Sequence, residues 1–318
     1  MRHLIIVNQK AGHVEESKNF LEEIEKEFEG LDFEIHLTTG PREVIDFIPK
    51  YCDQFKNDTV RIYACGGDGT IHEVANGLAN CKNAELAIYP IGTGNDFVKI
   101  YAKTDDYDEI VKNKAGVKRF LNFKDLINAK AKPIDISEIT GESLDKPWYS
   151  INVVNYGFDA IVGAKGNENK LKGKKNPYGF TQAIVPAILH GRFNKIEVFA
   201  DGEKLNEKKL LLSSVSQGQW VGGEYHASPK SNNSDGLLDV IVVKTMSFIY
   251  MMAKFFGAYQ HGTHLDGGFT KKIVYKQAKE VEIVAPNPID ICIDGEIVSG
   301  KQFKIKSLPG AIKLVIPE

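Results

Sequence analysis

The first 130 residues alternate between short apolar runs and stretches of helical periodicity, and this alternation constrains the fold more than any other feature. Helical periodicity occurs before residue 30, for example at Ile24 and Phe28, and again over residues 42–52 and 71–78. Four runs have the length and composition of strands: residues 4–7, 33–37, 60–65 and 86–90. This order predicts an α/β region with a parallel sheet, whose ligands bind beyond the carboxyl ends of the strands.

Beyond residue 131 the chain consists mostly of short strand-like runs separated by turn signals, such as Asp201-Gly202 and residues 307–310. The runs are residues 134–139, 149–154, 196–199, 210–216, 238–243, 273–275, 281–284, 289–293 and 311–316. This pattern predicts a mostly antiparallel, β-sandwich-like second domain. One insertion, at about residues 163–192, has the composition of a loop followed by a helix.

Length and composition exclude several classes of protein. A chain of 318 residues is long enough for about two domains. A net charge of −2 gives no basic excess, so we expect no nucleic-acid partner. Four cysteines without a C-x-x-C pair are typical of a reducing cytosol. The longest apolar stretch, residues 248–259, is short and broken by Lys254, which predicts no membrane span but leaves contact with a membrane surface open.

The sequence Gly-Gly-Asp-Gly-Thr at residues 66–70 directly follows the third strand. We expect Thr70 to be the N-cap of the next helix, with Glu73 completing a capping box. Glycines beside a helix N-terminus are typical of phosphate sites, although neither the Walker pattern nor G-x-G-x-x-G is present. The Asp68 carboxylate would repel a phosphate unless Mg²⁺ bridged the two. A plain strand-to-helix turn is the alternative.

Residues 92–97 repeat this arrangement after the fourth strand, with Thr93, Asn95 and Asp96 opening a helix. Asp96 would then be an ordinary N-cap, or the two turns together would form a shared phosphate site.

Asp-Gly-Glu occurs at residues 201–203 and 294–296. A two-residue hairpin turn is the default interpretation, and we adopt it for Asp201. An extended chain at the second copy would place Asp294 and Glu296 on one face, an arrangement that suits a general base. The segment from Ser234 to Asp239 is either a turn or a metal-binding loop.

A local basic run precedes an apolar, aromatic stretch at residues 177–189. The run comprises Lys165, Lys170, Lys172, Lys174 and Lys175. It is either a solvated loop or a contact for anionic lipid headgroups, and the stretch after it is either a core helix or the wall of an acyl pocket.

Taken in order along one chain, these motifs resemble the bacterial soluble diacylglycerol kinases, whose superfamily includes sphingosine kinases and NAD kinases. The resemblance rests on Asn8-Gln9-Lys10-Ala11-Gly12, Thr38, residues 66–70, 92–97, 155–159, 234–240 and 294–296, and Pro309-Gly310. The chain departs from the family pattern at Gln9, where proline is usual, and at Glu224, where a third glycine is common.

The resemblance implies a nucleotide-binding domain over residues 1–130, on which the chain end at about residues 300–318 packs back. A β-rich lipid-substrate and metal-binding domain would cover residues 131–299, with the active site in the cleft between the domains. The implied activity is ATP- and Mg²⁺-dependent phosphorylation of 1,2-diacylglycerol or a related lipid to phosphatidic acid. A kinase for a soluble acceptor such as NAD, and a catalytically silent lipid- or nucleotide-binding module, are the alternatives.

The resemblance also assigns roles to residues. Glu296 would be the general base with Asp294 beside it, and Asp68 and Asp96 would anchor a network of acids, water and Mg²⁺. ATP would contact Asn8, Gln9, Lys10, Ala11, Gly12, Thr38, Gly66, Gly67, Asp68, Gly69, Thr70, Ile71, His72 and Thr93. A further Mg²⁺ would be held by Asp235 and the carbonyls of Asn232 and Leu237. We expect a cytoplasmic protein that contacts the membrane transiently, with pairing of edge strands as a route to a homodimer.

Overall fold

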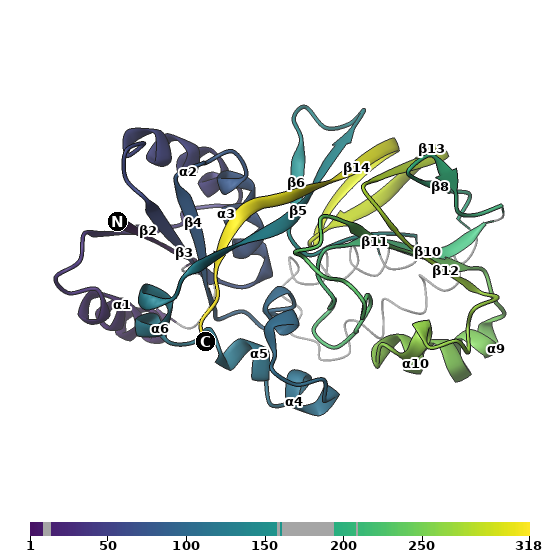
Figure 1. Cartoon of the computed structure of the whole chain (residues 1–318), viewed down its shortest axis with the longest axis horizontal. Coiled ribbons are helices and arrows are strands. Elements are labelled where there is room, and N and C mark those ends of the chain that lie inside the picture. Colours follow the sequence, from purple (N-terminus) through teal and green to yellow (C-terminus); the bar gives the residue numbers. More distant parts are fainter. Residues whose placement is uncertain (9–13, 158–159, 161–193, 208) are drawn as a thin grey trace. The chain divides into compact units, whose positions relative to one another are not determined.

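The computed structural model describes residues 1–8, 14–157, 160, 194–207 and 209–318. Internal contacts divide the chain into two compact units, one of Met1–Asp135 with Pro309–Glu318 and one of Ile136–Leu308. Figure 1 shows both units coloured along the chain. The expectations for Gln9, Lys10, Ala11 and Gly12, and those for residues 158–159 and 161–193, including the basic run, lie outside the described residues.

The first unit contains a parallel sheet in the order β2-β1-β3-β4-β14. Its strands and long helices are β1 (Arg2–Val7), α1 (Val14–Glu27), β2 (Phe33–Leu37), α2 (Glu43–Gln54), β3 (Val60–Gly66), α3 (Asp68–Leu78) and β4 (Ala84–Pro90), joined by the end of β14 (Glu296–Val315). Four short helices follow β4, namely η1 (Phe97–Tyr101), α4 (Tyr107–Val111), α5 (Ala115–Lys118) and α6 (Phe123–Asn128). The predicted α/β alternation is confirmed.

Helices cover both faces of this sheet (Figure 1). On one face Phe28, just after α1, and Phe123 of α6 pack edge-on with their rings 5.5 Å apart, and Phe28 also meets Tyr63 of β3. On the other face α2 packs against α3 so closely that a Cβ on Gly77 would lie 2.9 Å from the Cβ of Ile48. Two buried faces explain why β1 and β3 are almost continuously apolar.

The second unit is built on antiparallel strands in the order β12-β11-β10-β7-β13-β14. The elements are β5 (Ala131–Gly141), β6 (Trp148–Ser150), β7 (Val153–Gly157), β8 (Glu197–Ala200), β9 (Glu203–Lys204), β10 (Leu210–Ser216), β11 (Leu238–Lys244), β12 (Ile273–Ala278) and β13 (Glu280–Ile293). Four short helical segments lie between β11 and β12, namely α9 (Phe248–Tyr250), η2 (Met251–Phe255), α10 (Phe256–Gln260) and η3 (Thr263–Leu265). The predicted antiparallel β-rich domain is confirmed.

The turn expected at residues 307–310 does not end a strand, because β14 runs through it. Gly310 takes a positive φ of 62°, and its N–H donates to the Asp135 carboxylate at 2.8 Å. The chain therefore stays extended past Pro309 instead of reversing. Its last part then pairs in parallel with β4, with Leu314 opposite Leu86.

No described helix combines the length and the apolar character needed to cross a membrane.

Candidate functional site

Four predicted ligand turns, after β1, β2, β3 and β4, begin at one edge of the parallel sheet, because the strands before them end in register. Val7 of β1 pairs with Leu37 of β2 and with Cys65 of β3, and Gly66 pairs with Pro90 of β4. The predicted nucleotide residues that follow these strands, Asn8, Thr38, residues 66–72 and Thr93, therefore share this edge.

The turn after β3, at residues 66–70, differs from the prediction in where the next helix begins. Helix α3 begins at Asp68 with Gly67 as N-cap and no capping side chain, so the expected capping box of Thr70 and Glu73 is wrong. Thr70 lies inside the first helical turn, and its hydroxyl accepts a hydrogen bond from the Asn8 side chain at 3.1 Å. A Cβ on Gly66 would lie 2.3 Å from that hydroxyl. The missing side chain of Gly66 thus lets Thr70 turn inward and join two of the turns.

The side chains in this turn limit what each residue can offer a ligand. Ile71 and His72 are buried, with 1% and 3% of their surfaces exposed, while Gly69 and Thr93 are exposed. The predicted contacts of Ile71 and His72 are therefore restricted to their backbone atoms.

The turn after β2, which begins at Thr38, is held in place by a carboxylate of helix α2. The N–H and hydroxyl groups of Thr39 donate to Glu43 at 2.7 and 2.8 Å, and His36 contacts the same carboxylate at 2.9 Å. These contacts, Thr39 first, lower the pKa of Glu43 to about 2. Thr38, whose N–H donates to the Val7 carbonyl at 3.0 Å, is thereby held at the end of β2.

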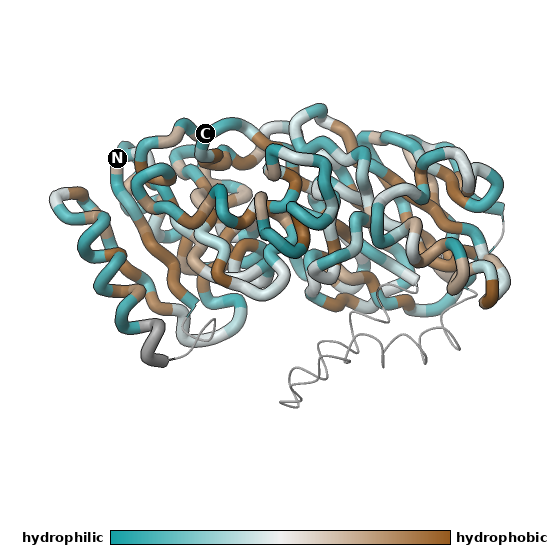
Figure 2. The backbone as a smooth tube through the Cα atoms, turned by 90° about the horizontal axis from the view of Figure 1, so that it is seen from below, coloured by the Kyte–Doolittle hydropathy of each residue, from teal (hydrophilic) through white to brown (hydrophobic). Residues whose placement is uncertain are grey.

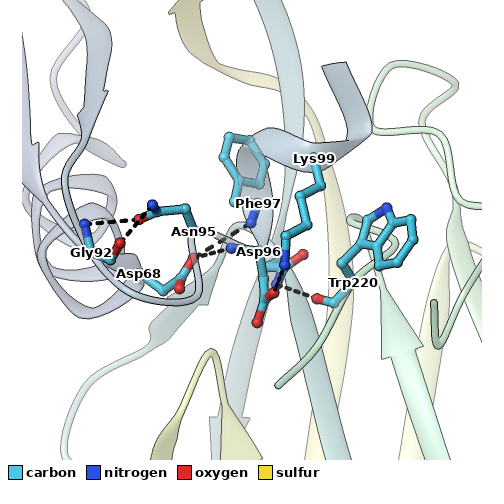
Figure 3. A network of polar contacts seen from close by, with 8 residues as sticks. Asp68, Gly92, Asn95, Asp96, Phe97, Lys99 and Trp220 are labelled. Atoms are coloured by element: carbon cyan, nitrogen blue, oxygen red, sulfur yellow. Dashed lines mark hydrogen bonds and ion pairs between the residues drawn. The ribbon is translucent and has the colours of Figure 1, made fainter. Parts of the chain in front are cut away.

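Gly67, in the turn after β3, and Gly92, in the turn after β4, make a close backbone contact. A Cβ on Gly92 would lie 2.4 Å from the Cα of Gly67 and 2.8 Å from the Asn95 side chain. Asn95 stabilises this approach from a left-handed conformation with φ of 49°. Its side chain accepts from the N–H of Gly92 at 3.0 Å and donates to the Gly92 carbonyl (Figure 3). It also donates to the carbonyl of Pro90.

We expect the substitution Gly92→Ala to destabilise the protein by about 1–3 kcal/mol, because its methyl group has no room beside Gly67. Urea unfolding of the purified chain measures this. Gly69→Ala is the matched control, since a Cβ there meets nothing within 4 Å and alanine suits a helix. Equal stability of the two variants would contradict the close approach.

Asp68, Asp96 and Lys99 form a charged cluster beside these turns (Figure 3). The Asp68 carboxylate accepts from the backbone N–H of Asp96 at 2.7 Å. The Asp96 carboxylate is paired with the buried Lys99 ammonium at 2.6 Å. Sequence reasoning placed Asn95 at the helix opening but did not identify Lys99; a cation three residues after Asp96, within an otherwise apolar helix, was the available signal for Lys99.

The two carboxylates of this cluster lie close together. A Cβ on Gly94 would be 2.8 Å from the Oδ2 atom of Asp68 and 3.6 Å from that of Asp96. Burial, and then the nearby charge of Asp96, raise the pKa of Asp68 to about 6. When all three groups are ionised, two carboxylates lie beside one ammonium, so these three groups together carry a net charge of −1. Such a cluster favours a proton or a cation.

The second Asp-Gly-Glu motif is a hairpin turn, so the extended alternative, which would have placed Asp294 and Glu296 on one face, is wrong. Asp294 and Gly295 have φ values of 49° and 104°, and Ile293 pairs with Glu296. Positive φ at both turn positions is typical of a two-residue hairpin. The first motif has the same form, with Ala200 paired to Glu203, which confirms the turn expected at Asp201.

The Asp294 carboxylate is occupied by hydrogen bonds within the second unit. It accepts from the Ser150 hydroxyl at 2.6 Å and from the N–H groups of Ile151, Asn152 and Val153 at 2.9–3.2 Å. These bonds fasten the hairpin to the link between β6 and β7. Glu296, the first residue of β14, is exposed at the other side of the turn. Asp294 is therefore placed to position the hairpin, while Glu296 faces solvent.

The predicted metal loop leads into β11. Asp235 accepts from the N–H of Leu237 at 3.0 Å and from the Gln277 side chain at 3.1 Å. Nearby Asp239 is fully buried; one of its oxygens accepts from Tyr275 at 2.6 Å, and its Oδ2 atom has no hydrogen-bond partner. Burial raises the pKa of Asp239. An orphaned buried carboxylate oxygen beside Asp235 fits a site for a hard cation.

Among the described residues, no group of three or more histidine, cysteine, aspartate or glutamate side chains could hold a metal ion. Mg²⁺, however, commonly takes one or two carboxylates and completes its shell with water, carbonyl or phosphate oxygens. The pair Asp68–Asp96 and the loop at Asp235 both have that character. Their donors therefore fit Mg²⁺ bound together with a nucleotide or with backbone oxygens.

Comparison with known proteins matches both parts of the chain to families. Residues 2–139 match the diacylglycerol kinase catalytic domain, and residues 152–316 match the YegS C-terminal NAD kinase beta sandwich-like domain. A relative from Pseudomonas aeruginosa named "Probable lipid kinase YegS-like" is 28% identical over 263 residues, covering 80% of this chain and 76% of the relative. The diacylglycerol kinase of Bacillus subtilis is 28% identical over 260 residues, covering 81% and 78%.

Solved structures show the same fold. A diacylglycerol kinase from Bacillus anthracis superimposes with a TM-score of 0.67 at 22% identity, covering 99% of this chain and 96% of that one.

Proposed function

Since the chain belongs to the lipid kinases that combine a diacylglycerol kinase catalytic domain with a YegS C-terminal domain, we propose that it phosphorylates 1,2-diacylglycerol with ATP and Mg²⁺. The products are phosphatidic acid and ADP. The paired carboxylates of Asp68 and Asp96 beside a glycine-lined helix N-terminus are the observation that carries this proposal. Phosphoryl transfer needs positioning and charge neutralisation more than covalent chemistry, and this set of groups supplies both.

The nucleotide phosphates are proposed to bind at the edge of the parallel sheet. The amides at the start of α3 point out of the helix end and attract anions, and Gly69 leaves open space beside them, because a Cβ there would meet nothing within 4 Å. Asn8, Thr38 and Thr93 flank this position from the neighbouring turns. Gln9, Lys10, Ala11 and Gly12, which directly follow Asn8 in the sequence, are also proposed to contact the nucleotide.

Asp68 and Asp96 are proposed to hold Mg²⁺ against the phosphates. The ion supplies charge neutralisation on the transferring phosphoryl group. Lys99 fixes the orientation of the Asp96 carboxylate through their ion pair, and the backbone of residues 96–97 fixes that of Asp68. Both acids are thus pre-oriented before a cation arrives.

Glu296 is proposed as the general base that takes the proton from the lipid hydroxyl. Its carboxylate is exposed at the start of β14, and the hairpin that carries it is fastened by Asp294. Asp294 acts as a positioning residue because its own oxygens already accept four hydrogen bonds. A second Mg²⁺ is proposed at Asp235 with the carbonyls of Asn232 and Leu237, where its role is to order the loop before β11.

The release of ADP from Mg-ATP tests the proposal. We expect turnover with diacylglycerol in mixed micelles, none with NAD⁺ in plain buffer, and loss of turnover when Mg²⁺ is chelated. Turnover with NAD⁺ alone would assign a soluble acceptor instead. ATP binding without ADP release on any lipid would indicate a silent binding module.

A further inference from the structure

The helical segment at residues 248–260 carries an unusual exposed apolar surface. Six large hydrophobic side chains of the described chain are exposed, and three of them, Phe248, Ile249 and Met252, lie within five consecutive residues here. Their exposed fractions are 45%, 78% and 48%. Figure 1 labels the segment α9 and α10, and Figure 2 colours the chain by hydropathy. Clustered exposed hydrophobic residues mark interaction sites more often than single ones do.

The opposite side of the same segment holds it on the second unit. Met251, Phe255 and Tyr259 are buried and pack with Ile241 of β11 in one hydrophobic cluster. The Ser247 side chain caps the first turn by accepting from the N–H of Tyr250. A buried apolar stripe already fixes the segment, so its outward side would ordinarily be polar. Phe248, Ile249 and Met252 are therefore not explained by the fold of the unit.

The stretch of chain that carries this surface is basic in sequence, while the Glu224 carboxylate accepts from the Gln260 side chain at the far end of the segment. Residues 244–272 contain four lysines and one aspartate, with no arginine or glutamate, which gives a formal charge of +3 in a chain whose net charge is −2. The lysines are Lys244, Lys254, Lys271 and Lys272. The N–H of Lys244 donates to the carbonyl of Lys272 at 2.8 Å, which brings the two ends of this stretch together. No ion pair joins these lysines to an acidic residue in the described part of the chain.

We propose that the 248–260 segment docks the enzyme on a membrane surface that contains anionic lipids. Phe248, Ile249 and Met252 would enter the boundary between headgroups and acyl chains, and the lysines would face the lipid phosphates. The proposal rests on the proposed function, because a diacylglycerol kinase must reach a substrate that resides in a bilayer. A second copy of the chain is a poorer occupant, since a two-fold contact would press the same four lysines against each other.

Vesicle co-sedimentation of the full chain tests this surface. The vesicles are phosphatidylcholine alone, or phosphatidylcholine with about one third phosphatidylglycerol. The variant Ile249→Gln/Met252→Gln removes apolar area without adding charge, and Leu121→Gln is the matched control, because Leu121 is an exposed leucine of the first unit. Lys254→Gln/Lys271→Gln tests the charge.

We expect the Ile249→Gln/Met252→Gln variant to bind the mixed vesicles roughly tenfold more weakly and the control to bind normally. The lysine variant should lose several-fold of the preference for anionic vesicles. Turnover of a short-chain diacylglycerol dissolved below its micellar concentration should be unchanged in all variants. Vesicle binding by wild type that is weakened in these surface variants would support the docking surface even if no diacylglycerol were phosphorylated. The absence of phosphorylation would then refute the proposed function alone.

Two results would overturn the proposal. One is vesicle binding by the Ile249→Gln/Met252→Gln variant that equals that of the control. The other is a wild-type dimer that becomes monomeric in this variant while vesicle binding persists, which would assign the surface to a second copy.

Discussion

Replacing Asp68 by asparagine should lower turnover at least roughly 100-fold and, in the absence of Mg²⁺, make the protein more stable. Both effects follow from one arrangement, in which Asp68 and Asp96 share the space over Gly94 and the Lys99 ammonium is paired with Asp96. The asparagine keeps an oxygen to accept from the N–H of Asp96 but carries no charge. The remaining carboxylate and ammonium then balance, while one proposed magnesium ligand is weakened.

The sign of the pH dependence follows from the raised pKa of Asp68. With a folded-state pKa of about 6 against an ordinary value of 3.8, the native protein binds a proton more tightly than the unfolded chain. Stability therefore falls as the pH rises from about 4 to about 6, by at most about 3 kcal/mol in the absence of a cation. The Asp68→Asn variant should not show this loss and should exceed wild type above pH 6.

Urea unfolding between pH 4 and pH 8 in a chelating buffer measures the difference, and ADP release measures the activity. Asp108→Asn is a suitable control, because it removes one carboxylate from an exposed ion pair with Lys112. Its stability and turnover should stay near those of wild type. A variant at Asp68 that is active, or that is less stable than wild type above pH 6, would contradict the proposed cluster.

Sequence patterns were sufficient for the first unit because its signals are local. Each buried parallel strand is a short apolar run, and the predicted strand at residues 60–65 differs from β3 by one residue. Parallel topology then brings the turns after the strands to one edge without further information. The acids Asp68 and Asp96 could be identified for this reason, since each lies one or two residues after a glycine in such a turn.

The features that sequence reasoning missed depend on contacts between distant residues. Thr70 has the sequence context of an N-cap, yet it lies inside α3 because Gly66 leaves room for its side chain and Asn8 donates to it. Asp294 has the context of a catalytic acid, yet the strands flanking it pair into a hairpin and residues 150–153 fill its hydrogen-bonding capacity. Each outcome needs a partner far along the chain, Asn8 for Thr70 and residues 150–153 for Asp294.

Replacing Glu296 by glutamine should lower kcat by roughly 10²- to 10⁴-fold and leave ATP binding unchanged. Glutamine has almost the same shape as glutamate, but it cannot accept the proton of a lipid hydroxyl. Glu296 is exposed at the start of β14, so the substitution should not alter folding. ADP release with diacylglycerol in micelles gives kcat, and fluorescence titration with an ATP analogue gives the binding constant.

The first Asp-Gly-Glu hairpin provides the control for the second. Glu203 follows a turn of the same conformation, with Asp201 and Gly202 at φ values of 48° and 80°. Its carboxylate is engaged by Lys276, so Glu203→Gln removes the same charge from the same local geometry. Loss of turnover in both variants would mean that net charge, and not a base at one position, determines the rate. Loss of turnover in Glu296→Gln alone would support a catalytic role for Glu296. The shape of the hairpin could not explain that result, because the two turns have the same conformation and differ only in their surroundings.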